Sequence, residues 1–213
     1  MTSRAAASIP LENAARRAGV QDSRVLDAFR KIDRRQFVPS AYVDRADTDR
    51  PIPIAHGQVT TQPSLVARML EALELSGGER VLEIGTGLGY QTAVLATLAR
   101  EVYSIERFAD LAAQACANLE RAGIRNATVV TGDGTRGLLE HAPYDAIVIA
   151  AAAPTVPPAL VEQLADGGRL VQPIGRGGDE LVTKFRKRDG RLVDEGMLTP
   201  AFFVPLVSGT QLQ

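Results

Sequence analysis

The sequence predicts an α/β protein whose core is a doubly wound, mostly parallel β-sheet, with an N-terminal helical extension and a C-terminal antiparallel hairpin. Two observations lead to this fold class. Short apolar runs alternate with helical patterns between residues 63 and 173, and a glycine-rich turn directly follows the first of these runs. The 213 residues are in the size range of one domain, which we expect to contain helices and a loop in 1–62 and a ligand-binding core in 63–213.

Helical and irregular stretches precede the sheet. Residues 10–32 have a helical pattern with one apolar face. That face is formed by Val25, Leu26, Phe29 and Ile32. The stretch from 42 to 61 contains prolines and a glycine without a sustained period, so we expect an ordered loop that forms a wall of the active site. A further helix is expected to begin at Pro63, because proline is favoured in the first turn of a helix.

From residue 81 onward, strand-like and helix-like stretches alternate. The predicted strands are 81–84, 102–105, 128–130, 146–149 and 170–173, and the predicted helices are 90–99, 109–122 and 158–165. Such alternation produces parallel strands joined by right-handed crossovers, and a sheet covered on both faces. The pattern then changes, and 181–185 and 191–193 are expected to form a hairpin that turns at Asp189-Gly190. A last apolar run, 202–207, could supply one more strand.

The composition excludes several classes of protein. Apolar residues make up 45% and charged residues 23% of the chain, as in ordinary folded domains. Lys and Arg number 24 against 25 for Asp and Glu, so there is no strong field to attract nucleic acid or an anionic membrane. No apolar run approaches membrane-spanning length, and the single cysteine, Cys116, excludes an intramolecular disulfide. We therefore expect a cytoplasmic protein without nucleic-acid or membrane partners.

The sharpest local signal is the sequence Glu-Ile-Gly-Thr-Gly-Leu-Gly-Tyr at 83–90. It lies between the first predicted strand and its helix, which is where open parallel sheets bind ligands. Gly85, Gly87 and Gly89 allow the backbone to turn sharply and a ligand to approach it closely. A tight strand-to-helix turn without a ligand is the alternative interpretation.

Acidic residues at the strand ends indicate which ligand this turn binds. Dinucleotide-binding turns have the spacing G-x-G-x-x-G, whereas the spacing here is G-x-G-x-G, preceded by Glu83. A carboxylate is repelled by a pyrophosphate, but it attracts the positively charged amino group and sulfonium of S-adenosylmethionine. Glu106 after the second strand could accept hydrogen bonds from both ribose hydroxyls, and Asp133 after the third could meet the adenine amino group. A solvated turn is the alternative for Asp133, and a nicotinamide dinucleotide is the remote alternative for the ligand.

Five stretches spread over most of the chain match one enzyme family. They are Arg35-Gln36-Phe37-Val38-Pro39, Gly57 to Pro63, Val81 to Gln91, Gly132-Asp133-Gly134 and Phe203-Val204-Pro205-Leu206. Together they resemble the bacterial protein-L-isoaspartate O-methyltransferases. The glycine turn alone marks only the wide class of such methyltransferases, and the loop ending in Gln62-Pro63 points to this family. The resemblance implies a Rossmann-like class I methyltransferase fold with S-adenosyl-L-methionine as cofactor.

The resemblance also implies the reaction and the substrate. The acceptor would be the α-carboxylate of L-isoaspartyl residues in damaged proteins, with D-aspartyl residues as a further candidate. The methyl ester would then collapse to a succinimide that partly reopens to normal aspartate, which starts repair. A different methyl acceptor and a non-catalytic adaptor that only binds the cofactor remain as alternatives. We expect the enzyme to be a monomer.

The candidate site residues follow from the same resemblance. Thr61 is the candidate catalytic residue, because the family usually carries a serine there whose hydroxyl lies near the methyl donor and the acceptor. Threonine keeps the hydroxyl but stiffens χ1, so the hydroxyl could be held in a different direction; alternatively, Thr61 caps the helix that begins near Pro63. The expected cofactor-binding residues are Thr60, Thr61, Glu83, Gly85, Thr86, Gly87, Gly89, Glu106, Arg107, Asp133 and Gly134.

A carboxylate acceptor makes a general base unnecessary. Its reference pKa of about 4 keeps it ionised near neutral pH. Catalysis can then depend on removing water from the acceptor and aligning its oxygen with the methyl carbon, and positioning alone can contribute about 7–11 kcal/mol. We therefore assign no catalytic role to His56 or His141, and we expect no metal ion.

Overall fold

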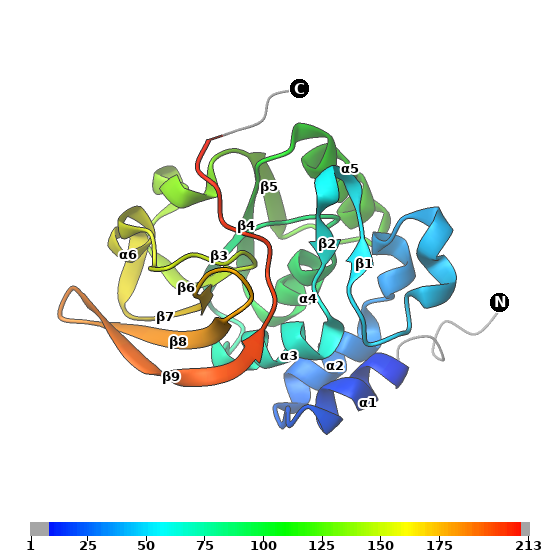
Figure 1. Ribbon diagram of the computed structural model, residues 1–213, viewed down its shortest axis with the longest axis horizontal. Coiled ribbons are helices and arrows are strands. Elements are labelled where there is room, and N and C mark those ends of the chain that lie inside the picture. Colours follow the sequence, from blue (N-terminus) through cyan, green and yellow to red (C-terminus); the bar gives the residue numbers. More distant parts are fainter. Residues whose placement is uncertain (1–8, 210–213) are drawn as a thin grey trace.

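The computed structural model describes residues 9–209, and its elements follow the predicted order (Figure 1). The α-helices are α1 (Ile9–Arg17), α2 (Ser23–Lys31), α3 (Pro63–Ala72), α4 (Tyr90–Leu98), α5 (Ala109–Arg121) and α6 (Pro158–Gln163). The strands are β1 (Ile52–Pro53), β2 (Val59–Thr60), β3 (Arg80–Ile84), β4 (Glu101–Glu106), β5 (Ala127–Thr131), β6 (Tyr144–Ile149), β7 (Leu164–Ile174), β8 (Glu180–Arg188) and β9 (Arg191–Ala201). Short 3-10 helices are η1 (Arg34–Phe37), η2 (Ser40–Arg45), η3 (Ala55–Gly57), η4 (Gly134–Arg136) and η5 (Leu139–His141). No helix in this described part has the length and apolar character needed to cross a membrane.

The central sheet has seven strands in the order β5-β4-β3-β6-β7-β8-β9. The first five strands in this order are parallel to one another, and β8 and β9 are antiparallel to their neighbours. The chain first builds β4 and β5 on one side of β3 and then returns to place β6 on the other side, so the strand order reverses between β3 and β6. The prediction of a doubly wound, mostly parallel sheet is confirmed. Its switch point is the place where this class of fold binds ligands.

Side chains alternate between the two faces of the sheet, as the two-residue period of a strand requires. On one face, Val81 and Val148 belong to a core that includes the apolar sides of α1 to α5. On the other face, Leu82 and Ile147 pack with Leu160 of α6. The sheet is therefore covered on both faces, which fixes the ends of its central strands.

The C-terminal hairpin forms as predicted but is longer than its sequence pattern indicated. Asp189 and Gly190 both have positive φ, 51° and 73°, which is the backbone of a two-residue hairpin turn. The flanking strands extend back to Glu180 and forward to Ala201. This hairpin forms one end of the sheet, drawn in orange in Figure 1.

The expectation of one more strand at 202–207 is wrong. After β9 the chain continues through residues 202–209, which we call the C-terminal strap (red in Figure 1). The strap is attached to Ala152, in the segment that follows β6, by two backbone hydrogen bonds, from Ala152 N to Val204 O (2.8 Å) and from Leu206 N to Ala152 O (2.7 Å). Pro205 between them has no N–H to continue a ladder, and it makes only an isolated bridge.

The N-terminal extension packs against the sheet domain through its helices. Residues 10–32 form α1 and α2, which are separated near Gly19 (φ 95°) and contact α3 and α4. The predicted loop at 42–61 is ordered and contains the short antiparallel pair β1 and β2, in which Ile52 lies opposite Thr60. Strands of two residues are too short to give a pattern in the sequence.

Candidate active site

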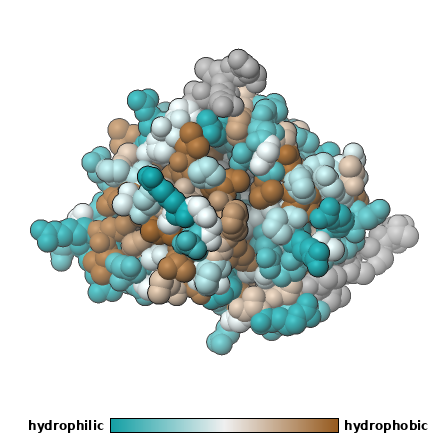
Figure 2. Space-filling view, in the orientation of Figure 1, coloured by the Kyte–Doolittle hydropathy of each residue, from teal (hydrophilic) through white to brown (hydrophobic). Residues whose placement is uncertain are grey.

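A cleft of about 930 Å³ opens at the carboxyl ends of β3, β4 and β6, where the strand order reverses. Hydrophobic residues gather in the middle of this face of the molecule (Figure 2). Eight of the eleven predicted cofactor-binding residues line this first cleft: Thr60, Thr61, Gly85, Thr86, Gly87, Glu106, Arg107 and Gly134. Glu83, Gly89 and Asp133 do not, and the structure gives a physical reason for each.

The glycine turn forms the floor of the first cleft. Gly85 and Gly87 have φ of 93° and 56°, in the left-handed region that favours glycine. Gly89 (φ 90°) precedes α4 and faces away from the cleft, because a Cβ there would lie 3.4 Å from Cγ of Leu119 on α5. The third glycine therefore allows the helices to pack closely, and the first two allow a ligand to approach the backbone.

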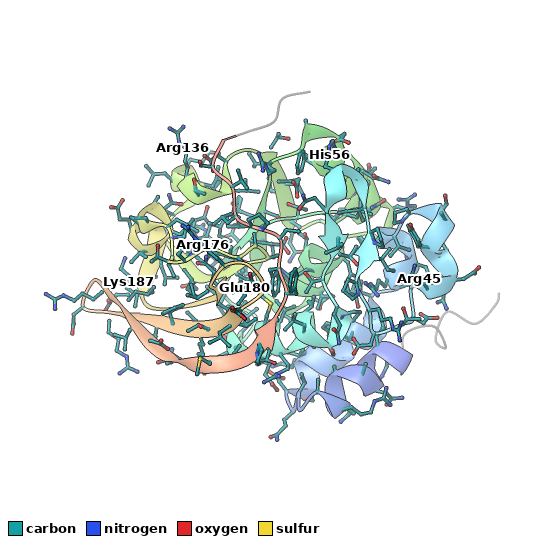
Figure 3. The ribbon with its side chains drawn as sticks, viewed as in Figure 1. Arg45, His56, Arg136, Arg176, Glu180 and Lys187 are labelled. Atoms are coloured by element: carbon teal, nitrogen blue, oxygen red, sulfur yellow. The ribbon has the colours of Figure 1, made fainter. Side chains whose placement is uncertain are left out.

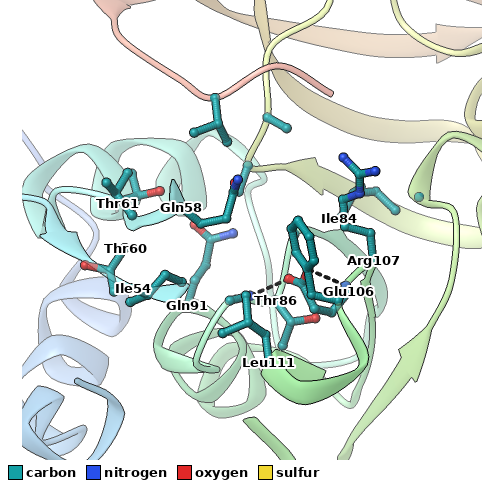
Figure 4. Close-up of a pocket in the computed structure, with 18 of the residues that line it drawn as sticks. Ile54, Gln58, Thr60, Thr61, Ile84, Thr86, Gln91, Glu106, Arg107 and Leu111 are labelled. Carbon is teal, nitrogen blue, oxygen red and sulfur yellow. Dashed lines mark hydrogen bonds between the residues drawn. The ribbon is translucent and has the colours of Figure 1, made fainter. Parts of the chain in front are cut away.

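Glu106 ends β4 with its carboxylate at the rim of the turn (Figure 4). The side chain is 5% exposed, and its oxygens accept hydrogen bonds from the backbone N–H groups of Gly87 (2.8 Å) and Phe108 (3.1 Å). Burial raises the pKa of Glu106 above its ordinary value, although the hydrogen bond from Gly87 acts in the opposite direction. The adjacent guanidinium of Arg107 lies over the ring of Phe108 at 5.1 Å.

Glu83 does not line the first cleft, and its contact with the cofactor stays a prediction. The side chain is fully buried, since strand alternation turns it into the protein from β3. One carboxylate oxygen accepts hydrogen bonds from the hydroxyls of Ser104 (2.6 Å) and Thr92, and the amide of Gln91 lies beside the same carboxylate. Burial raises the pKa of Glu83 to about 7. Ser104 also bonds the hydroxyl of Thr86 (2.5 Å), so Glu83 supports the turn from below.

Asp133 is also turned away from the first cleft. One carboxylate oxygen caps η4 by accepting from the backbone N–H of Thr135 (2.9 Å) and from its hydroxyl (2.7 Å). The other accepts from the backbone N–H of Gly209 in the C-terminal strap (2.7 Å). The sequence contained no sign that the strap would reach this residue, and the contact of Asp133 with the adenine amino group stays a prediction.

Arg34 organises the loop that carries Thr60 and Thr61, a role that no pattern in the sequence indicates. Its side chain is buried (1% exposed) and donates to the carbonyl oxygens of Thr48 and Arg50 at 3.0 Å each. It also donates to the hydroxyl of Thr60 (2.7 Å), so this hydroxyl faces the loop interior. An arginine in a charged run such as Asp33-Arg34-Arg35 is typical of a surface, which explains why it was missed.

Thr61 lies where the first cleft meets a second one. The second cleft has a volume of about 960 Å³ and is lined by residues of 59–68 and of 199–204, among others. Thr61 lines both clefts. The capping alternative for Thr61 does not apply, because Asp49 accepts from the N–H of Ser64 (2.8 Å) in the first turn of α3 and from the side chain of Gln62 (3.0 Å).

His56 has a structural role in the loop. Its Nε2 lies 2.9 Å from the carboxylate oxygens of Asp110, and its ring stacks on Phe108 at 4.1 Å. This contact lowers the pKa of Asp110. Figure 3 shows His56 near α5, and it does not line the first cleft. Between residues 9 and 209, there is no group of three or more His, Cys, Asp and Glu side chains that could hold a metal ion.

Comparisons with known proteins agree with this architecture. The family model described as protein-L-isoaspartate(D-aspartate) O-methyltransferase matches residues 9–211. A protein-L-isoaspartate O-methyltransferase of Koribacter versatilis is 48% identical over 192 residues, which cover 90% of this chain and 86% of the relative. One of Methanoculleus marisnigri is 50% identical, with coverage of 90% and 87%.

Solved structures give the same result. A protein-L-isoaspartate O-methyltransferase superimposes with a TM-score of 0.84 at 31% identity, covering 93% of this chain and 65% of that one. A Plasmodium falciparum structure, described as an enzyme of this kind in complex with S-adenosyl-L-homocysteine, has a TM-score of 0.83 at 26% identity, covering 95% and 99%. Since the family model spans nearly the whole chain and relatives at about half identity cover nine-tenths of it, the chain belongs to the protein-L-isoaspartate(D-aspartate) O-methyltransferase family.

Proposed function

We propose that this protein transfers the methyl group of S-adenosyl-L-methionine to the α-carboxylate of L-isoaspartyl residues in damaged proteins, and that D-aspartyl residues are a second acceptor. The observation that carries the proposal is the position of Thr61 at the junction of two clefts. A methyl transferase needs a donor site and an acceptor site that meet at the reacting atoms. Family membership makes isoaspartyl protein the favoured acceptor.

The first cleft fits the adenosyl donor. The buried carboxylate of Glu106 lies at its rim and can accept from ribose hydroxyls. Gly134 must be glycine, since a Cβ there would lie 2.3 Å from Cγ2 of Ile84, and it leaves a flat approach for a base. Ile54 and Leu111 supply apolar walls. Contact of Asp133 with the adenine amino group would require its carboxylate to share or release the N–H of Gly209.

The chemistry needs few side chains. When bound, the donor would supply an electrophilic sulfonium methyl group. An acceptor carboxylate oxygen would displace the sulfur in line, so that the O–CH3 bond forms as the S–CH3 bond breaks and S-adenosylhomocysteine leaves with the electron pair. An ionised carboxylate needs no general base, so the chain has to desolvate the acceptor and orient it. We assign the orientation to the hydroxyl of Thr61, and the exclusion of water to the apolar side chains of Val204 and Leu206 in the C-terminal strap, which line the first cleft.

The second cleft is suited to a polypeptide acceptor. It joins the loop before α3 to the end of β9, and its lining combines the cation of Arg68 with the apolar side chains of Leu65 and Phe203. A damaged segment lying there would bring its carboxylate to Thr61. We propose further that 1–213 works as one domain, as a monomer, and in the cytoplasm, where the single cysteine Cys116 would stay reduced.

The experiment is methylation of a matched peptide pair. Transfer of labelled methyl to an isoaspartyl peptide, with none to its aspartyl twin, is the expected result. Turnover with neither peptide but with a small carboxylic acid would identify a different acceptor. Binding of S-adenosylhomocysteine without any turnover would indicate an adaptor, and would contradict the proposal.

Thr61 variants test the orienting hydroxyl. Thr61→Ser keeps the hydroxyl and is expected to retain or raise the turnover of the isoaspartyl peptide, whereas Thr61→Val is expected to lower it. Thr97→Val, which removes a hydroxyl from the exposed side of α4, is the matched control. Equal turnover for the chain and both Thr61 variants would remove Thr61 from the mechanism.

A further inference from the structure

Gln91 is the second residue of α4 and lines the first cleft (Figure 4). Its side chain is 8% exposed, its amide lies beside the buried carboxylate of Glu83, and its amide oxygen has no hydrogen-bond partner. Leaving a buried amide oxygen unpaired is unfavourable. Since native proteins pair the great majority of such groups, an amide oxygen that lies against a ligand cleft without a partner points to a ligand that pairs it.

Burial of an unpaired amide does not by itself indicate a ligand. Gln172 of β7 is fully buried and its amide also lacks partners, but it lines neither the first nor the second cleft. Gln91 differs because its amide is beside the glycine turn and on the path from Glu106 to Thr61 (Figure 4). A ligand in the first cleft can therefore reach the amide of Gln91.

We propose that Gln91 binds the α-amino acid end of the methyl donor, with its amide oxygen accepting from the ammonium group and its amide nitrogen donating to the carboxylate. The amide nitrogen has two N–H donors, so one can face Glu83 while the other donates to a ligand, and the amide oxygen accepts. An α-amino acid offers both complements on one carbon. The carboxylate of an acceptor would pair the nitrogen alone. The adenosine end of the donor already has Glu106 and Gly134, so the amino acid end falls towards Gln91.

This assignment rests on the proposed function, and it gives Gln91 a contact that the sequence pattern predicts for Glu83. Glu83 is separated from the first cleft, because it does not line it and is hydrogen bonded to Ser104 and Thr92 within the protein. Its carboxylate lies one layer below, where ionisation would still favour a cation above it. Gln91 makes the hydrogen bonds to the amino acid end of the donor, and the carboxylate of Glu83 attracts its ammonium group electrostatically.

Calorimetric titration of the full chain with two ligands tests the inference. S-adenosylhomocysteine carries the amino acid end, and 5′-methylthioadenosine keeps the adenosine and sulfur but lacks it. We expect Gln91→Met to weaken binding of S-adenosylhomocysteine about 10- to 100-fold and to change binding of 5′-methylthioadenosine less than about twofold. Gln172→Met, the matched buried control, is expected to change neither affinity.

Gln91→Glu keeps the size of the side chain and tests the contact if the Met variant does not fold. It replaces the donating amide nitrogen with a negatively charged oxygen that repels the ligand carboxylate. S-adenosylhomocysteine is therefore expected to bind more weakly to Gln91→Glu than to Gln91→Met. Equal weakening of both ligands, or unchanged affinity for S-adenosylhomocysteine, would overturn the inference. Failure of the unsubstituted chain to bind S-adenosylhomocysteine would instead overturn the proposed function, and the inference with it.

Discussion

The two clefts that meet at Thr61 are built in different ways. The first cleft is formed mainly by the ends of buried parallel strands and the glycine turn between β3 and α4. The second is formed by the loop before α3 with the first turns of α3, and by the end of β9 with the residues that follow it. Strand ends are fixed by the packing of the whole sheet, whereas irregular chain has to be held by individual contacts between distant residues.

The contacts that hold the second cleft can be named. Arg34 reaches the backbone of Thr48 and Arg50, and Asp49 reaches the start of α3. Losing one of these residues is therefore expected to damage the loop and the acceptor site. Losing a polar group of the first cleft is expected to lower ligand affinity and to leave the fold in place.

Arg34→Met tests this difference with the largest expected effect. We expect the free energy of unfolding to fall by about 3–4 kcal/mol. Each lost hydrogen bond to the charged donor contributes about 1.5–3 kcal/mol, and the total is smaller than their sum because methionine avoids the desolvation of a buried guanidinium. Urea unfolding measures this loss. Turnover of the isoaspartyl peptide is expected to fall further than affinity for S-adenosylhomocysteine at a temperature where the variant is folded.

The neighbouring Arg35 gives the matched control for Arg34. Its side chain is about one-third exposed and pairs with Asp47 on the surface. Exposed pairs of this kind contribute at most about 1 kcal/mol, so Arg35→Met is expected to change stability little. Equal losses for the two variants would show that the loop does not depend on the buried guanidinium.

The same difference explains how much of the molecule could be predicted from its sequence. The sheet order and the glycine turn follow from local patterns, because apolar runs and glycine spacing are written in adjacent residues. Asp133 was placed at the correct strand end, but its contact with Gly209 spans 76 residues and has no local signal. Arg34 and Gln91 were missed for the same reason, since burial by distant segments gives each its role.

Glu83→Gln tests whether the buried carboxylate of Glu83 makes the stability of the protein depend on pH. Burial raises the pKa of Glu83 from 4.5 to about 7 in the folded state. An acid with a raised folded pKa stabilises the protein fully below its unfolded pKa, and this stability is lost as pH rises through the folded pKa. At about 1.4 kcal/mol for each pKa unit, the loss is about 3 kcal/mol between pH 4.5 and just above 7.

The Gln variant stays neutral over this range and is expected to show a flatter dependence of stability on pH. The free energy of unfolding of the variant, relative to the unsubstituted chain, is therefore expected to rise by about 3 kcal/mol from pH 4.5 to pH 8. Urea unfolding at each pH measures the difference. Parallel curves for the two proteins would mean that Glu83 ionises without cost in the fold, and that the turn is not supported by a desolvated carboxylate.

Glu106→Gln has the smallest expected effect and isolates the first cleft. A glutamine has one acceptor oxygen in place of two, so it cannot serve the N–H groups of Gly87 and Phe108 and a ribose hydroxyl as the carboxylate does. A charge-assisted hydrogen bond contributes about 1.5–3 kcal/mol, so we expect calorimetry to show affinity for S-adenosylhomocysteine reduced about 10- to 100-fold. Glu101→Gln, at the opposite end of β4, is the control and is expected to leave this affinity unchanged. If Glu106→Gln also destabilised the fold as much as Arg34→Met, the contrast between a cleft fixed by the sheet and a cleft fixed by single contacts would fail.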